Sequence, residues 1–188
     1  MQKIRVLVPI AKGFEEIEAV SIIDVLRRAE IEVLVASLND NFLIQGANGI
    51  TIQADLDIKE VDAKTLDMIV LPGGWEGTHA LAEDENVLKI LREMDERGQN
   101  IAAICAAPFA LSAASVLKQK FTCYPSVEDE IKEKGYMGDK QMVVEDANIT
   151  TSRGPATAIC FALALVKKLR GEATYQALKE GLLADYCK

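Results

Sequence analysis

The fold of this chain is decided by one stretch near its centre, Asn100-Ile101-Ala102-Ala103-Ile104-Cys105-Ala106-Ala107-Pro108. The apolar run Ile101–Ile104 is typical of a fully buried strand, and it ends at Cys105. Pro108 is favoured in the first turn of a helix, which the sequence predicts over Phe109–Val116. Cys105 is therefore expected on a tight strand-to-helix turn, with its side chain exposed above the edge of the sheet. This is the geometry of a nucleophile elbow, although the Gly-x-Ser-x-Gly motif is absent.

A cysteine at such a corner has two interpretations. The positive end of a helix and free backbone N–H groups both favour the thiolate, which is the nucleophilic form. A buried cysteine is otherwise a small apolar side chain without reactivity. The stretch alone leaves both interpretations open.

Strands and helices alternate along the chain. Strands are predicted at Ile4–Ile10, Glu32–Ser37, Met68–Leu71 and Phe121–Tyr124, and in two hairpins, Phe42–Ile44 with Ile50–Gln53 and Met142–Val144 with Ile149–Ser152. Further helices are predicted at Glu15–Ala29, Asp84–Arg97, Ser126–Lys134, Ala156–Leu169 and Glu172–Tyr186. The main strands are apolar throughout rather than alternating, which is typical of a parallel sheet covered on both faces. We therefore expect an α/β protein, a three-layer sandwich with a mainly parallel sheet, that binds ligands at the carboxyl ends of its strands.

Composition narrows the class of protein. The 188 residues are 49% hydrophobic and 27% charged, which is typical of a folded chain, and we expect residues 1–188 to form a single domain. The net charge of −8 argues against nucleic acid and anionic membranes as partners. No apolar run reaches the roughly 20 residues of a membrane span. The first residues lead into a strand without a signal-peptide pattern, so we expect a cytoplasmic protein.

The four cysteines are Cys105, Cys123, Cys160 and Cys187. They form no Cys-x-x-Cys motif, so we expect neither a zinc site nor a disulfide framework, and no metal or other cofactor. Cys160 lies within the most apolar predicted helix and is expected to be packed and inert. We expect Cys187 to be mobile. It would either oxidise during handling or form an intermolecular disulfide.

Glu18 stands out on the first predicted helix. It shares one stripe with apolar residues at helical spacing, namely Phe14, Ile22, Val25 and Ala29. A carboxylate is almost never fully buried unless it is paired. We interpret Glu18 as a carboxyl group that points to the active end of the sheet, with a pKa raised by desolvation. The alternative is a first-turn glutamate favoured by the helix dipole, which explains Glu15 and Glu16 better.

Gly73 and Gly74 follow the strand Met68–Leu71. Two glycines at a strand end let the backbone approach a ligand and present its N–H groups, and a tight turn that requires positive φ is a compatible interpretation. The chain's only histidine, His79, could face the rim of the cleft, but we expect a solvated loop residue, so a Cys–His–Asp hydrolase fits poorly. Cys123 and Tyr124 precede Pro125 and either approach the elbow from the next strand or are ordinarily buried.

Taken in order, four segments resemble the ThiJ/PfpI superfamily, in particular the clade of Parkinson disease protein 7 and its bacterial relatives. The matching segments are Ala11-Lys12-Gly13-Phe14-Glu15-Glu16-Ile17-Glu18, Leu71-Pro72-Gly73-Gly74, Ala102-Ala103-Ile104-Cys105-Ala106 and Thr151-Ser152-Arg153-Gly154-Pro155. The resemblance implies a flavodoxin-like sandwich that forms a homodimer, with Cys105 as the reactive cysteine of the elbow.

The resemblance also implies roles for single residues. Glu18 would hydrogen-bond the Cys105 sulfur and stabilise its sulfinate form. The backbone at Gly73, Gly74 and Ala106 would form the oxyanion pocket, and Arg153 would lie near the cleft.

Three positions depart from the family pattern. Tyr124 stands where the clade often has a histidine, which removes the usual proton shuttle from the cleft. Asn48 stands at a cleft position that is arginine in the best-known relative, and Cys160 stands where relatives commonly have an acid. Ala106 replaces the histidine of the peptidase branch, so we do not expect a protease.

The leading hypothesis is a cysteine-dependent, cofactor-independent glyoxalase or deglycase. It would act on methylglyoxal-type 2-oxoaldehydes or on their glycated adducts, with slow turnover because the histidine is missing. The alternative is an oxidative-stress sensor or protective chaperone whose Cys105 oxidises to sulfinate. A third interpretation, a non-catalytic dimeric module, requires Cys105 to be unreactive.

Overall fold

A seven-stranded sheet forms the centre of the computed structural model, which describes residues 3–187. Its strand order is β5-β2-β1-β6-β7-β9-β8, and each neighbouring pair is parallel except β8 with β9. The strands are β1 (Arg5–Ile10), β2 (Glu32–Ser37), β5 (Leu56–Asp57), β6 (Met68–Leu71), β7 (Asn100–Ile104), β8 (Val143–Asp146) and β9 (Ile149–Ser152). The predicted α/β sandwich with a mainly parallel sheet is confirmed.

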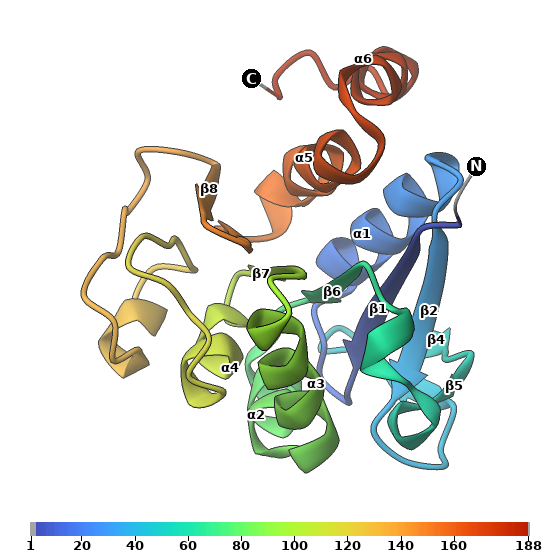
Figure 1. Cartoon of the computed structure of the whole chain (residues 1–188), viewed down its shortest axis with the longest axis vertical. Helices are drawn as coiled ribbons and strands as arrows, with labels where there is room; N and C mark the ends of the chain where they lie inside the picture. The colour runs from blue at the N-terminus through green and yellow to red at the C-terminus, as the bar shows by residue number, and fades with distance from the viewer. Residues whose placement is uncertain (1–2, 188) are drawn as a thin grey trace.

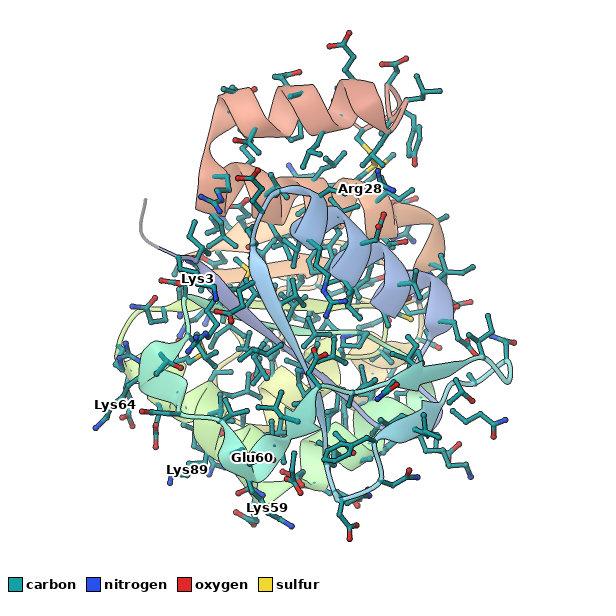
Figure 2. All side chains as sticks on the ribbon, turned by 90° about the vertical axis from the view of Figure 1, so that its right-hand side faces the viewer. Lys3, Arg28, Lys59, Glu60, Lys64 and Lys89 are labelled. Carbon is teal, nitrogen blue, oxygen red and sulfur yellow. A yellow bond between two sulfur atoms is a disulfide. The ribbon has the colours of Figure 1, made fainter. Side chains whose placement is uncertain are left out.

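Helices cover both faces of the sheet (Figure 1). One face carries α1 (Glu16–Arg28) and α5 (Ala158–Arg170), and α6 (Glu172–Gly181) packs outside α5, as Figure 2 also shows. The other face carries α2 (Trp75–Glu83), α3 (Glu85–Glu96) and α4 (Pro108–Ala113). Because both faces are covered, every residue of β6 is buried, which explains the apolar strands. Among residues 3–187 no helix combines the length and the apolar character that a membrane crossing requires.

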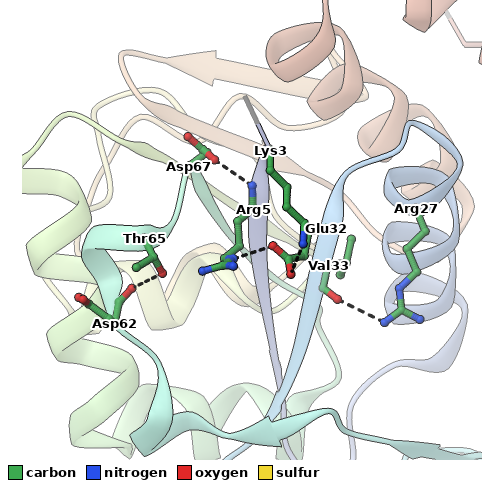
Figure 3. Close-up of polar contacts among 8 residues, drawn as sticks. All are labelled: Lys3, Arg5, Arg27, Glu32, Val33, Asp62, Thr65 and Asp67. Atoms are coloured by element: carbon green, nitrogen blue, oxygen red, sulfur yellow. Dashed lines mark hydrogen bonds and ion pairs between the residues drawn. The ribbon is translucent and has the colours of Figure 1, made fainter. Parts of the chain in front are cut away.

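Polar contacts hold together the amino ends of β1 and β2 (Figure 3). Arg5 Nε and Lys3 Nζ both donate to the Glu32 carboxylate, at 2.7 and 3.0 Å. The Arg5 N–H donates to Asp67 Oδ2, directly before β6, at 2.8 Å. These bonds hold Arg5 opposite Glu32 in the parallel register. Charged groups therefore stabilise the amino ends of these strands, whereas the candidate site lies at the carboxyl ends.

Several elements differ from the sequence-based expectations. Trp75–Glu83 forms α2, so His79 lies on a helix and not in a loop. The expected strand at Phe121–Tyr124 is reduced to one bridge between Phe121 and Tyr136. The expected helix Ser126–Lys134 is a single 3-10 turn, η3 (Val127–Glu130), because Ser126 before it is left-handed with φ 78° and Ile131 after it is extended.

Both predicted hairpins are present. The strands β3 (Leu43–Gln45) and β4 (Thr51–Gln53) pair antiparallel outside the main sheet, and β8 pairs with β9 within it. The last helix, α6, ends at Gly181, before the predicted Tyr186.

The interpretation of two cysteines was wrong. Cys160 on α5 and Cys187 near the C-terminus form an intramolecular disulfide, with their Cα atoms 5.1 Å apart. Cys187 is 2% exposed and packs against the core rather than extending into solvent. The turn at Gly171 folds α6 back on α5, which brings the C-terminal segment to Cys160.

Candidate active site

Cys105 occupies the turn between β7 and α4. Its φ is +63°, a left-handed conformation that is uncommon for a residue other than glycine. The turn is held because the Cys105 N–H donates to Ser152 O at 3.0 Å and the Tyr124 N–H donates to Cys105 O at 2.9 Å. Pro108 takes the first position of α4, as predicted. The residue is 8% exposed, so it is more enclosed than a side chain standing above the sheet edge.

Glu18 is fully buried on the inner face of α1. Its Oε2 accepts the Gly73 N–H at 2.8 Å, while its buried Oε1 accepts no N–H or hydroxyl group among the described residues. The Glu18 N–H donates to the side chain of Glu15, which caps the helix at 2.8 Å. Glu15 therefore has the N-terminal role expected of it, and Glu18 has a different one.

Two glycines allow the carboxyl and the thiol to meet. A Cβ atom on Gly73 would lie 2.6 Å from both Glu18 Oε2 and Cys105 Cβ, and 3.1 Å from Cys105 Sγ. Gly74 has φ +91°, and a Cβ there would lie 2.3 Å from the backbone oxygen of Gly13. Both reasons for a glycine, a positive φ and a close approach of the backbone, therefore apply at Gly74.

Burial raises the pKa of the Glu18 carboxyl to about 7, although hydrogen bonds donated by the Cys105 thiol and the Gly73 N–H oppose the rise and the charge of Glu15 adds to it. A carboxyl group with this pKa can both hold and release a proton near neutral pH.

Burial also raises the pKa of the Cys105 thiol well above its usual range, and the charge and hydrogen bond of Glu18 raise it further. The backbone N–H groups of Gly74 and Ala106 hydrogen-bond the sulfur and oppose this rise. The expectation that the turn alone favours the thiolate is therefore corrected. Protonation of Glu18 removes its charge and turns the carboxyl into a donor, so the thiolate is favoured when Glu18 holds the proton.

The predicted backbone donors divide into two groups. Gly74 and Ala106 direct their N–H groups at the Cys105 sulfur, where an oxyanion would form. The Gly73 N–H is already bonded to Glu18 and positions that carboxyl instead. Two of the three predicted N–H groups therefore face the sulfur.

A cavity of about 630 Å³ opens in front of the thiol. Tyr124 is half exposed at its wall, as the sequence suggested. Sequence reasoning did not identify most of the lining, because an acidic 3-10 turn has no periodic pattern that marks a face. The residues that line the cavity are Glu15, Gly74, Trp75, Cys105, Ala106, Tyr124, Ser126, Val127, Asp129, Glu130 and Pro155.

Asn48 and Arg153 do not line this cavity, contrary to expectation. Asn48 donates its backbone and side-chain N–H groups to the carboxylate of Glu16, at 2.6 and 3.0 Å. Arg153 hydrogen-bonds the hydroxyl of Tyr136 and lies near the buried thiol of Cys123. Burial and the charge of Glu128 raise the pKa of Cys123 to about 12, so this second thiol is protonated.

His79 supports the cavity wall from behind. Its ring meets that of Trp75 edge-on, with centroids 4.5 Å apart, and lies 5.1 Å from the ring of Phe109. It is therefore a partly buried packing residue, and the expectation of a solvated loop histidine was wrong. Within residues 3–187 no three His, Cys, Asp or Glu side chains are grouped to bind a metal ion.

Comparisons with known proteins agree with this geometry. The model of the DJ-1/PfpI family matches residues 4–168. The chain is 40% identical to protein dj-1beta of Drosophila melanogaster, over 96% of this chain and 97% of the relative. It is 38% identical to the glutathione-independent glyoxalase DJR-1.2 of Caenorhabditis elegans, over 90% of this chain and 91% of the relative. The solved structure of oxidised Toxoplasma gondii DJ-1 superposes with a TM-score of 0.90 at 37% identity, over 96% of this chain and 98% of that one.

Proposed function

The chain belongs to the DJ-1/PfpI family, and on this premise we propose that it is a cysteine-dependent glyoxalase or deglycase that works without a cofactor. Its substrates would be methylglyoxal-type 2-oxoaldehydes or their glycated adducts. The observation that carries the proposal is the Glu18–Cys105 pair, buried together at the base of a cavity with two N–H donors aimed at the sulfur. The naming of one relative as a glutathione-independent glyoxalase supports the same activity.

The first step forms a bond between sulfur and carbon. The Cys105 thiolate attacks the aldehyde carbon of methylglyoxal, and the oxygen takes the Glu18 proton to give a hemithioacetal. The N–H groups of Gly74 and Ala106 would stabilise the negative oxygen before it is protonated, a contribution of about 3 kcal/mol.

The second step moves hydrogen between the two carbons. Glu18, now a carboxylate, removes the proton from the former aldehyde carbon to form an enediol, and a proton returns to the neighbouring carbon. The aldehyde carbon is thereby oxidised and the ketone carbon reduced, so no external oxidant or reductant is needed. Water then cleaves the resulting thioester, which releases lactate and restores the thiol.

Formation of lactate from methylglyoxal tests the proposal. Cys105→Ser is expected to abolish lactate formation, whereas Cys123→Ser, at a buried thiol outside the cavity, is the matched control. Lactate formed by the Cys105→Ser variant at the rate of the unchanged protein would refute the enzyme proposal.

Oxidative sensing or chaperone protection is the second candidate, and a specific feature favours it. The Glu18 carboxyl and the N–H groups of Gly74 and Ala106 all hydrogen-bond the sulfur of Cys105, and the same groups suit the oxygens of a sulfinate. Each peroxide equivalent would transfer one oxygen to Cys105 and leave as water, first to sulfenate and then to sulfinate. Mass spectrometry after mild peroxide treatment is expected to place two added oxygens on Cys105, and oxidation of Cys123 first would contradict this role.

We also propose that the chain forms a homodimer. Ile17 and Val20 on α1 are 58% and 48% exposed, and Leu43 and Ile50 of the neighbouring hairpin are 61% and 56% exposed. Glu16 ties that hairpin to α1, so these apolar residues lie on adjoining elements that a second copy could cover. Light scattering is expected to give the mass of a dimer for the unchanged protein and of a monomer for Val20→Lys.

A further inference from the structure

We propose that the Cys105 cavity selects positively charged substrates. The preferred ligand is a 2-oxoaldehyde or aldehyde adduct that carries an ammonium or guanidinium group. This inference rests on the proposed function, because it assigns a substrate class to the same cavity. The residues that determine the specificity are Glu15, Asp129 and Glu130, which we call the rim acids.

The cavity lining carries negative charge only. Three of its eleven residues are the rim acids, and none is lysine, arginine or histidine. The Glu18–Cys105 pair at its base adds a further negative charge once it has lost one of its two protons. An anionic substrate therefore meets repulsion both at the mouth and at the reacting sulfur, whereas a cation is attracted at both.

No ion pair in the described part of the chain neutralises the rim acids, although Glu15 also caps the start of α1. None of them takes part in the ion pairs found among residues 3–187. Glu15 accepts one N–H, that of Glu18, with its Oε2. The net charge of −8 leaves no surplus of cations elsewhere to offset this field. Their charges therefore remain available to a ligand.

Backbone bonds hold two of the rim acids in place relative to the thiol. The Tyr124 N–H donates to Cys105 O, and the Val127 N–H donates to Tyr124 O at 3.1 Å. These bonds connect η3, which carries Asp129 and Glu130, to the Cys105 turn at the end of β7. Glu15 approaches from the start of α1, so the acids reach the cavity from two separate elements.

Aromatic side chains add a second means of recognising cations. Trp75 and Tyr124 both line the cavity and are 48% and 50% exposed, so their rings remain accessible to a ligand. Ammonium and guanidinium groups bind to such faces. The cavity volume of about 630 Å³ is in the range that holds drug-sized ligands, so a charged side group fits beside a three-carbon reactive end.

The first experiment measures charge selection at Cys105 without turnover. The rate at which Cys105 is modified is compared for two methanethiosulfonates, one with a trimethylammonium group and one with a sulfonate group. Each rate is divided by that of free 2-mercaptoethanol, which removes the intrinsic reactivity of the reagent. We expect the normalised preference for the cationic reagent to be about tenfold and to shrink at high salt.

The second experiment compares kcat/KM for phenylglyoxal with a 4-trimethylammonio or a 4-carboxylate substituent. The double variant Asp129→Asn with Glu130→Gln is expected to reduce the preference for the cation roughly threefold or more in both experiments, mainly through KM. Glu83→Gln with Glu96→Gln is the matched control, because it removes two charges outside the cavity lining and is expected to keep the preference.

The outcomes separate this inference from the proposed function. A normalised reagent ratio of one, or a preference that is as large in the Asp129 and Glu130 double variant as in the unchanged protein, would overturn the charge selection even if methylglyoxal is converted. Absence of lactate with an intact reagent preference would refute the glyoxalase proposal and support the charge selection.

Discussion

The carboxyl of Glu18 and the thiol of Cys105 meet in the space that a side chain at Gly73 would fill, 2.6 and 3.1 Å from the position of its Cβ, although they come from different elements, α1 and the end of β7. The absence of a side chain at Gly73 lets them meet, and its N–H fixes the carboxyl. Burial makes this pair hold a proton near neutral pH. The chemistry proposed above depends on that shared proton.

Glu18→Gln is expected to change how stability depends on pH. Because the folded state raises the pKa of Glu18 from 4.5 to about 7, the folded protein retains a proton there that the unfolded chain releases. The free energy of unfolding therefore falls as pH rises from 4.5 to 7, by about 3 kcal/mol. The glutamine variant lacks this loss, so it should gain about that much relative to the unchanged protein between pH 4.5 and pH 8.

Urea unfolding across this pH range measures the difference. Glu180→Gln, at an exposed position on α6, is the matched control. A difference between Glu18→Gln and the unchanged protein that stays constant with pH would show that folding does not raise the pKa of Glu18.

Gly74→Ala is expected to damage both stability and catalysis. The added Cβ would meet the backbone of Gly13, which cannot move aside as a flexible side chain does. Gly49→Ala is the control, because Gly49 has nearly the same φ, +88°, but nothing within 4 Å of the added atom. We expect Gly74→Ala to unfold at least about 1 kcal/mol more easily than the control and to lose about 100-fold in kcat. Equal stability of the two variants would contradict the close approach at Gly74.

The Cys160–Cys187 disulfide is expected to stabilise the oxidised protein by about 3.5 kcal/mol, because it closes a loop with a sequence separation of 27. Cys187→Ser should lower the free energy of unfolding by that amount under oxidising conditions and by much less with a reductant present. Cys123→Ser should not show this dependence on reductant. Free-thiol titration that finds four reactive cysteines in the unfolded, unreduced protein would contradict the bond.

Glu16→Gln is expected to loosen the β3–β4 hairpin. Burial would raise the pKa of Glu16, but the hydrogen bonds from Asn48 and Ile50 outweigh it and hold the pKa below its ordinary value. The bonds therefore stabilise the fold above the unfolded pKa of 4.5 and are lost as pH falls through the lower folded value. Hydrogen exchange at the Asn48 amide should be about tenfold faster in the variant at pH 7. Unchanged exchange would show that Glu16 does not anchor the hairpin.

Local patterns were sufficient to predict where Cys105 and Glu18 lie. An apolar run that ends at a cysteine before Pro108 predicts the turn at Cys105. A single carboxyl on an apolar stripe predicts the burial of Glu18 and its raised pKa. Both signals depend on neighbours within one or two elements, where periodicity is informative.

The cavity and the disulfide could not be predicted in the same way. The rim acids Asp129 and Glu130 belong to a 3-10 turn, and its direction is set by the left-handed Ser126 and by a bond to the Cys105 turn. Cys187 reaches Cys160 because α6 folds back after Gly171. No periodic pattern of residues marks such a reversal of the chain. These features depend on how elements cross, and spacing along the chain does not contain that information.

The most direct test of the central claim is to detect the carbon–sulfur intermediate. The protein is mixed with methylglyoxal labelled with carbon-13 at the aldehyde carbon, and the hemithioacetal carbon is followed by NMR in the unchanged protein and in Cys105→Ser. The account predicts one methylglyoxal unit on Cys105, with greater accumulation in Glu18→Gln, which can accept the aldehyde but cannot move the proton. An adduct confined to other residues while lactate still forms would contradict it.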